Sequence, residues 1–312
     1  MASSLEPRSV DDLGLDELVT EAGSEPAADY DLRSTLELVE LMNAQDETVP
    51  AAVAAATGQI TAAIEAIAEG LGRGGRLIYV GAGSSGRIAD LDASECESTF
   101  STPAGQVVAL VAGGADASPS EQASAEDDRD AGRADVEALE PRAEDVVVGV
   151  SASGRTPFVV SALEAAADAG ARTACVVSVP GSELETVVEL PIVVVVGAEF
   201  LAGSTRLKAG TAQKLVLNML STISMIRLGK TYGNLMVDVA ATNEKLRARV
   251  RRIVRAATGA PPDDVDAALS ADGDAKVAIV SLLAGIGADE ARARLDAAGQ
   301  SIRKAVSQEI AE

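Results

Sequence analysis

The chain has 312 residues, 47% of them hydrophobic, which is enough to bury a sizeable core in one large domain or two moderate ones. It carries 26 Lys and Arg against 48 Asp and Glu, so its net charge is −22, and this charge argues against a nucleic-acid or anionic-membrane partner. The chain has no histidine and only two cysteines, and these counts exclude histidine acid–base catalysis, a disulfide framework and the usual zinc sites.

The N-terminal residues predict a loosely ordered arm followed by helices. Residues 1–33 are rich in Asp, Glu, Ser and Pro, with one short helix expected at 13–19. A helix begins at Ser34, where Ser34 and Glu37 match a capping box, and an Ala-rich helix is expected over 49–71. The arm has no signal-peptide pattern, and no apolar stretch reaches the ~20 residues of a membrane span, so we expect a cytoplasmic protein.

Short β-branched runs then alternate with helical segments. This alternation predicts an α/β fold with a doubly wound parallel sheet flanked by helices. The expected strands are 77–80, 107–111, 146–150, 173–177 and 192–196. A long helix is expected over 208–228, another over 243–257, and three short helices over 261–312 that form a small C-terminal bundle.

The first candidate site is a glycine-rich turn after the first strand. Gly81, Gly83 and Gly86 spell G-x-G-x-x-G, the fingerprint of a dinucleotide site. Such a site also needs an acid at the end of the second strand, and the residues there are Val-Ala-Gly-Gly. Ser84 and Ser85 instead place two hydroxyls at a helix N-terminus, which suits either a phosphomonoester or simple helix capping.

A second turn of the same character follows the third strand. Ser151, Ser153 and Thr156 precede a helix that begins at Pro157. Since the carboxyl ends of parallel strands share one edge of the sheet, the two turns favour a single anion site over two independent caps.

Three further residues are weighed as chemical groups. Glu95 is expected just past the helix that follows the first loop, pointing back toward the strand ends. Glu126 is expected in a helix among other acids, and its surroundings alone indicate a solvated side chain. Cys96 has no histidine to activate it and is interpreted as a small packing residue.

With these residues in view, the chain resembles the N-acetylmuramic acid 6-phosphate etherases of the sugar isomerase (SIS) superfamily. The matching segments cover most of the chain and are ELVELMNAQDETVP (37–50), RLIYVGAGSSGR (76–87), DASEC (92–96), DVVVGVSASGRTP (145–157), GSTRLKAGTAQKLVLNMLST (203–222) and GKTYGNLMVDVAATNEKL (229–246). The resemblance implies cleavage of a D-lactyl ether from the 6-phosphate sugar, giving N-acetylglucosamine 6-phosphate and D-lactate.

The resemblance also implies roles for individual residues. Glu95 would protonate the departing lactate, and Glu126 would be the second catalytic glutamate. The hydroxyls that would hold the sugar phosphate are those of Ser84, Ser85, Ser151, Ser153 and Thr156. No metal or organic cofactor is implied, and the partners are the phosphosugar and a second copy of the chain in a homodimer.

The expected organisation is an N-terminal arm and helix (1–50), a SIS sugar-phosphate-binding domain (51–246) and a C-terminal helical domain (247–312). The alternative function is a non-catalytic phosphosugar-binding regulatory protein. A sensor that controls transcription needs a basic DNA-reading module, and the sequence offers none.

Overall fold

The fold is built on a parallel β-sheet, described in a computed structural model over residues 27–114, 118–239 and 244–307. Its strands are β1 (Leu77–Gly81), β2 (Val107–Val111), β3 (Val146–Val150), β4 (Arg172–Val177) and β5 (Leu190–Val193). All neighbours pair in parallel, in the order β2-β1-β3-β4-β5, so the predicted α/β doubly wound sheet is confirmed. β5 spans Leu190–Val193 rather than the predicted 192–196. β4 ends at Val177, which pairs with Val193, so residues after Val193 have no partner in β4.

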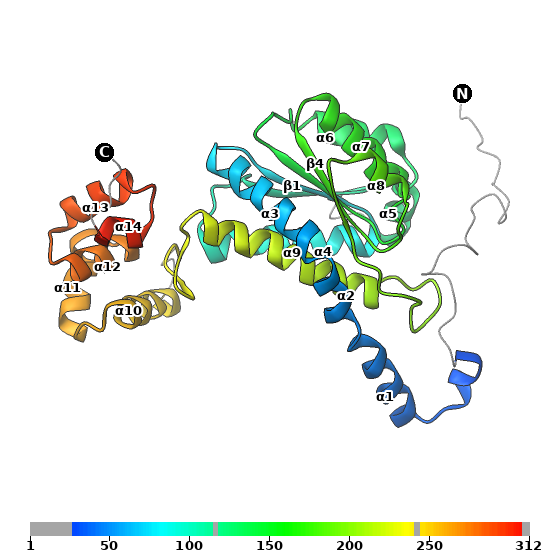
Figure 1. The fold of residues 1–312 in the computed structure, drawn as a ribbon, viewed down its shortest axis with the longest axis horizontal. Coiled ribbons are helices and arrows are strands. Elements are labelled where there is room, and N and C mark those ends of the chain that lie inside the picture. The colour runs from blue at the N-terminus through cyan, green and yellow to red at the C-terminus, as the bar shows by residue number, and fades with distance from the viewer. Residues whose placement is uncertain (1–26, 115–117, 240–243, 308–312) are drawn as a thin grey trace.

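Helices cover both faces of this sheet (Figure 1). One face carries α3 (Thr57–Gly72), α4 (Gly83–Phe100) and α9 (Lys208–Arg227), and the other carries α6 (Arg129–Glu137), α7 (Pro157–Asp168) and α8 (Glu183–Val187). Alternate residues of β3 belong to the two different cores, as the period of two in a strand requires. α5 (Pro119–Ala125) precedes α6.

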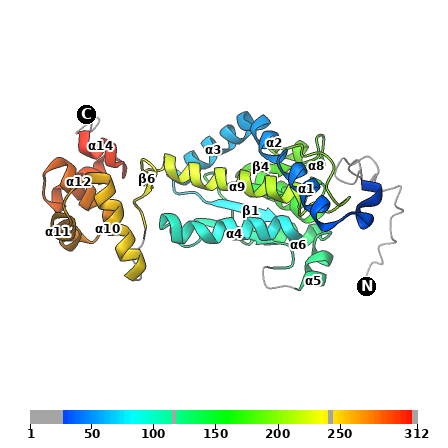
Figure 2. The same cartoon turned by 90° about the horizontal axis from the view of Figure 1, so that it is seen from below.

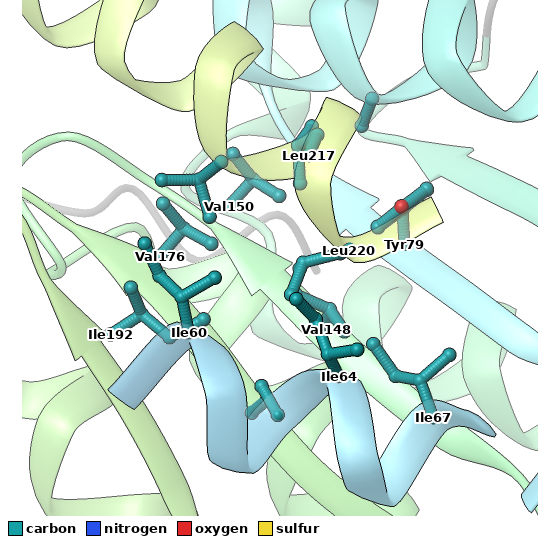
Figure 3. Packing of buried hydrophobic residues seen from close by; sticks show 14 of the residues in the cluster. Ile60, Ile64, Ile67, Tyr79, Val148, Val150, Val176, Ile192, Leu217 and Leu220 are labelled. Carbon is teal, nitrogen blue, oxygen red and sulfur yellow. The ribbon is translucent and has the colours of Figure 1, made fainter. Parts of the chain in front are cut away.

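The core under α3 and α9 explains why these segments form helices in these places. Ile60, Ile64 and Ile67 recur at helical spacing along one face of α3. They pack with Leu217 and Leu220 of α9 over the valines of β3 (Figure 3). The predicted long helix over 208–228 is therefore a core helix of this layer.

The N-terminal helices differ in part from the prediction. The capping box at Ser34 and Glu37 is present at the start of α1 (Thr35–Asp46). The single helix predicted over 49–71 is wrong: the chain forms α2 (Val49–Ala55) and α3, and the Thr57 hydroxyl bonds the Ala54 carbonyl at the break. α1 follows the 3-10 helix η3 (Ala27–Leu32) and projects from the body (Figure 1). The helix predicted at 13–19 lies outside the described residues.

The C-terminal segment forms its own group of helices, set apart from the sheet (Figure 2). It contains a hairpin of β6 (Thr231–Tyr232) and β7 (Leu235–Met236), then α10 (Glu244–Thr258), α11 (Pro262–Asp272), α12 (Ala275–Ala284), α13 (Ala288–Ala297) and α14 (Ile302–Ser307). The prediction of three short helices over 261–312 is wrong, because the described residues there form four helices, α11 to α14. Gly273 and Gly285 adopt positive φ and end α11 and α12. The segment has a separate hydrophobic core that includes Ile253, Ile279 and Leu295.

Within the described ranges, no helix by itself is long and apolar enough for a membrane span. Only the bent pair Thr35–Ala55 and Thr57–Gly72 meets that criterion jointly, by length and composition.

Candidate active site

The two hydroxyl-bearing loops leave the sheet side by side. β1 and β3 are direct neighbours, and Gly81 pairs in register with Val150. The loops that begin at Ala82 and Ser151 therefore start at the same level of the carboxyl edge. This is the edge at which open α/β sheets bind their ligands.

In the first loop, α4 begins immediately after β1. Ala82 is the N-cap residue, and Ser84 and Ser85 lie half-buried in the first turn. A Cβ on Gly86 would stand 2.8 Å from the Gly81 carbonyl oxygen and 2.9 Å from Val111 Cγ1, so Gly86 lets the helix approach the strands. Close packing accounts for this glycine without a dinucleotide.

The second loop turns its hydroxyls toward one another. The oxygens of Ser151 and Thr156 are 2.9 Å apart, those of Ser151 and Ser153 are 3.4 Å apart, and the Gly154 amide donates to Ser151 at 3.1 Å. Thr156 is the N-cap residue of α7, yet its side chain makes no capping bond. Capping of the following helix therefore does not explain Thr156.

Glu126 lies beside the second loop, in the turn between α5 and α6 rather than in the predicted helix. The Thr156 hydroxyl donates a hydrogen bond to Glu126 Oε1 at 3.3 Å, and the Phe158 amide donates to the Glu126 carbonyl at 3.1 Å. Burial raises the pKa of the Glu126 carboxyl, which the Thr156 bond opposes and the charge of Asp127 reinforces. The expectation of a solvated surface residue is thus wrong, because α7 holds this turn against the hydroxyl loop.

Glu95 is not where the sequence analysis expected it. It lies inside α4, which continues to Phe100, and it is exposed. Twelve residues separate it from the start of the helix at Gly83, which is roughly 18 Å along the axis. The prediction was wrong because nothing in the sequence ends this helix before Phe100. As a result, a single protomer does not bring Glu95 to the hydroxyl loops.

A buried polar cluster that the sequence does not indicate lies one helical turn before Glu95. Asp92 of α4 is 4% exposed and accepts a hydrogen bond from the Tyr79 hydroxyl at 3.0 Å. Ser221 of α9 also bonds it, and Lys214 Nζ is 4.0 Å away. Burial raises the pKa of Asp92 despite these partners. The only signal in the sequence is an acid at a position where the helical period predicts the core.

Cys96 belongs to the same layer and is buried, as its interpretation as a packing residue predicted. Burial, with the charge of Asp92 as a second cause, raises the pKa of its thiol to about 12. A thiol in this state is a poor nucleophile near neutral pH.

Comparison with known proteins agrees with the fold. The profile of the glucokinase regulatory protein N-terminal SIS domain matches residues 59–167. A phosphoheptose isomerase structure from Francisella tularensis covers 62% of this chain and 100% of its own, with a TM-score of 0.50 and 19% sequence identity. At this identity the likeness bears on the fold alone.

Two relatives share most of the sequence. An N-acetylmuramic acid 6-phosphate etherase of Rubrobacter xylanophilus is 57% identical over 295 residues, covering 94% of this chain and 97% of its own. One of Streptomyces coelicolor is 56% identical over 294 residues, covering 94% of both chains. The protein therefore belongs to the N-acetylmuramic acid 6-phosphate etherase family.

Proposed function

We propose that the protein cleaves the D-lactyl ether of N-acetylmuramic acid 6-phosphate with water, giving N-acetylglucosamine 6-phosphate and D-lactate. The observation that carries the proposal is the half-buried Glu126 carboxyl, hydrogen-bonded to Thr156 of the hydroxyl loop. Near-full-length similarity to the named etherases supports the same activity. A phosphorylated sugar is a charged metabolite that does not cross membranes freely, so the proposed location is the cytoplasm.

The hydroxyl loops are the proposed site of the sugar phosphate. The phosphate oxygens are hydrogen-bond acceptors, and the hydroxyls of Ser84, Ser85, Ser151, Ser153 and Thr156 can all donate. The amide groups in the first turn of α4 add further donors and a favourable dipole. Such a site binds a monoester at the carboxyl edge and leaves the rest of the sugar free to reach the acids.

The elimination of lactate requires a base and an acid. In the open-chain sugar, the C2 proton is alpha to the C1 aldehyde, so a base can remove it and lactate can leave from C3 as the C2–C3 double bond forms. Water then adds its oxygen to C3 and a proton returns to C2. We assign Glu126 as the base at C2 and Glu95 as the acid that protonates the departing oxygen.

This assignment requires a second protomer, because Glu95 lies far along α4 from the hydroxyl loops. Two features support a homodimer. Leu91 is one helical turn before Glu95 and is 48% exposed, so an apolar contact surface accompanies the acid. α1 has no buried residues and exposes Leu36 and Val39 at 67% and 60%. In a homodimer that covers these surfaces, the partner's Glu95 would reach the hydroxyl loops of this protomer and complete the site.

We further propose that 51–246 is the sugar-phosphate-binding domain and that 1–50 and 247–312 are accessory segments. The separate hydrophobic core of the C-terminal helices supports a C-terminal unit, and because this core includes Val237 and Val239, the unit begins before residue 247.

The activity is tested by incubating the full chain with N-acetylmuramic acid 6-phosphate and assaying D-lactate. We expect stoichiometric D-lactate and N-acetylglucosamine 6-phosphate without added metal. Binding of the phosphosugar with no release of lactate would favour the regulatory alternative.

A further inference from the structure

Lys208, the first residue of α9, has a charged side chain whose burial the fold does not explain. It is 6% exposed, and no hydrogen bond or ion pair joins its ammonium group to any residue within the described ranges. The Lys208 side chain is largely buried, and an ammonium without a protein partner in such a position is costly unless water or a ligand reaches it. Proteins keep such violations mainly at functional sites.

The nearby carboxylate of Glu199 is already engaged elsewhere. Glu199 is fully buried, and its two oxygens accept hydrogen bonds from the backbone amides of Lys208 at 2.8 Å and Ala209 at 2.9 Å. It therefore satisfies the free amides at the start of α9. The side-chain ammonium of Lys208 remains available to a ligand.

The Lys208 ammonium lies at the carboxyl edge of the sheet, the edge from which the hydroxyl loops also leave. Gly197 lies four residues beyond β5, and a Cβ built on it would stand 3.9 Å from Lys208 Nζ. Because Gly197 has no side chain, it leaves the ammonium uncovered on this side. The residue adopts φ +71°, which further favours glycine.

The packing of α9 against α4 sets the level of Lys208 relative to the first loop. The two helices run side by side in the same direction: a Cβ on Gly210 would lie 3.5 Å from Ile88 Cδ1, and Lys214 approaches Asp92 at 4.0 Å. Lys208, at the start of α9, is thus level with the first turn of α4, where Ser84 and Ser85 lie.

We propose that Lys208 binds an anionic group of the substrate and adds a positive charge to the site at the start of α9. This inference rests on the proposed etherase function, whose substrate carries two anions: the 6-phosphate and the lactyl carboxylate. An ammonium recognises either as a point charge. In a chain of net charge −22, one cation at the site offsets the repulsion that a substrate with two anionic groups meets.

The test compares the full-length protein with Lys208→Met, which fills the same space without charge. The control is Arg227→Met, which removes one positive charge from the far end of α9, where Arg227 is exposed. For each protein, calorimetry gives the Kd of inorganic phosphate and of N-acetylglucosamine 6-phosphate, and initial rates give the KM of N-acetylmuramic acid 6-phosphate. We expect Lys208→Met to raise that KM by roughly 10- to 100-fold, as the loss of a hydrogen bond to a charged group does.

The two anions are distinguished by the other ligands. A parallel rise in both Kd values assigns Lys208 to the phosphate, and unchanged Kd values with a raised KM assign it to the lactyl carboxylate. The melting temperature of Lys208→Met should stay close to that of the unsubstituted protein, because the ammonium makes no hydrogen bond or ion pair to the described residues that the variant would lose.

Unchanged Kd and KM values in Lys208→Met would overturn the inference, and so would a variant that fails to fold, since the ammonium would then serve the structure. If the unsubstituted protein binds phosphate but releases no lactate, the proposed function fails instead, and the phosphate titrations still report on Lys208.

Discussion

The hydrogen bond from Thr156 to Glu126 connects the two tasks of the site, phosphate binding and proton transfer. Thr156 belongs to the hydroxyl cluster, and its hydrogen bond stabilises the ionised form of Glu126. Burial acts in the opposite direction and is the larger cause, so the pKa of Glu126 lies above its ordinary value of 4.5. A carboxylate with a raised pKa is a stronger base than an exposed one.

The pH dependence of kcat/KM follows from this balance. The base works only when ionised, so the rate is lost as the pH falls through the pKa, and the acid limb should lie above pH 4.5. Thr156→Val removes a bond that lowers this pKa and should move the limb to higher pH. Thr61→Val, at an exposed threonine of α3, is the control. If Thr156→Val leaves the acid limb at the same pH, the ionisation of Glu126 does not control kcat/KM.

Replacement of the loop serines tests the proposed phosphate site. Ser85→Ala and Ser153→Ala should raise KM more than they lower kcat, because a phosphate remote from C3 is held similarly in the ground and transition states. Each lost bond to the charged phosphate should cost about 1.5–3 kcal/mol of binding. Ser270→Ala, at an exposed serine of α11, should change neither constant. An unaltered KM in both loop variants would mean that these serines serve only the fold.

At the scale of elements, the contact between α6 and α7 holds the turn that carries Glu126. A Cβ on Gly132 of α6 would lie 2.1 Å from the Phe158 carbonyl oxygen and 2.7 Å from Ser161 Oγ. The Phe158 amide in turn bonds the Glu126 carbonyl. A change in the spacing of these helices therefore reaches the acid through the backbone.

Gly132→Ala should destabilise the protein by about 1–3 kcal/mol through overpacking, and it should lower kcat/KM as Glu126 shifts. Gly58→Ala on α3 is the matched control, since nothing lies within 4 Å of its Cβ and alanine favours a helix by roughly 0.5–1 kcal/mol. Urea denaturation and initial rates measure both effects. A Gly132→Ala variant as stable as Gly58→Ala would show that α6 moves away freely.

The sheet, its helices and the two hydroxyl loops could be predicted from the sequence alone, but the surroundings of the two glutamates could not. The sheet and its helices were predictable because β-branched runs and helical periods are local patterns, and both hydroxyl loops follow directly from their strands. The burial of Glu126 was not predictable, since it depends on α7, whose Thr156 is 30 residues away. The position of Glu95 within α4 was missed because the helix passes through it without a stop signal.

In the whole molecule, the projecting α1 and the exposed face of α4 are the surfaces that the proposed homodimer would cover. α1 presents Leu36 and Val39 to solvent, and an isolated helix of this length is marginal without a partner. The proposed homodimer covers these side chains and supplies the acid that one protomer lacks. Assembly and catalysis should therefore fail together.

The double variant Leu36→Asp, Val39→Asp should shift the protein from dimer to monomer in sedimentation velocity and should abolish lactate release. Thr35→Asp adds a negative charge in the first turn of α1, where helices tolerate it, and should leave both unchanged. A double variant that sediments as a monomer and keeps full activity would exclude a second protomer from the site.

Exchange of the C2 proton with deuterium from solvent, followed by NMR, shows whether two glutamates divide the elimination between them. Glu95→Gln should lose ether cleavage but still exchange the C2 proton, because exchange needs only a base beside C2. Glu126→Gln should lose both. Exchange abolished in Glu95→Gln but retained in Glu126→Gln would reverse the two roles, and normal lactate release by both variants would contradict the account.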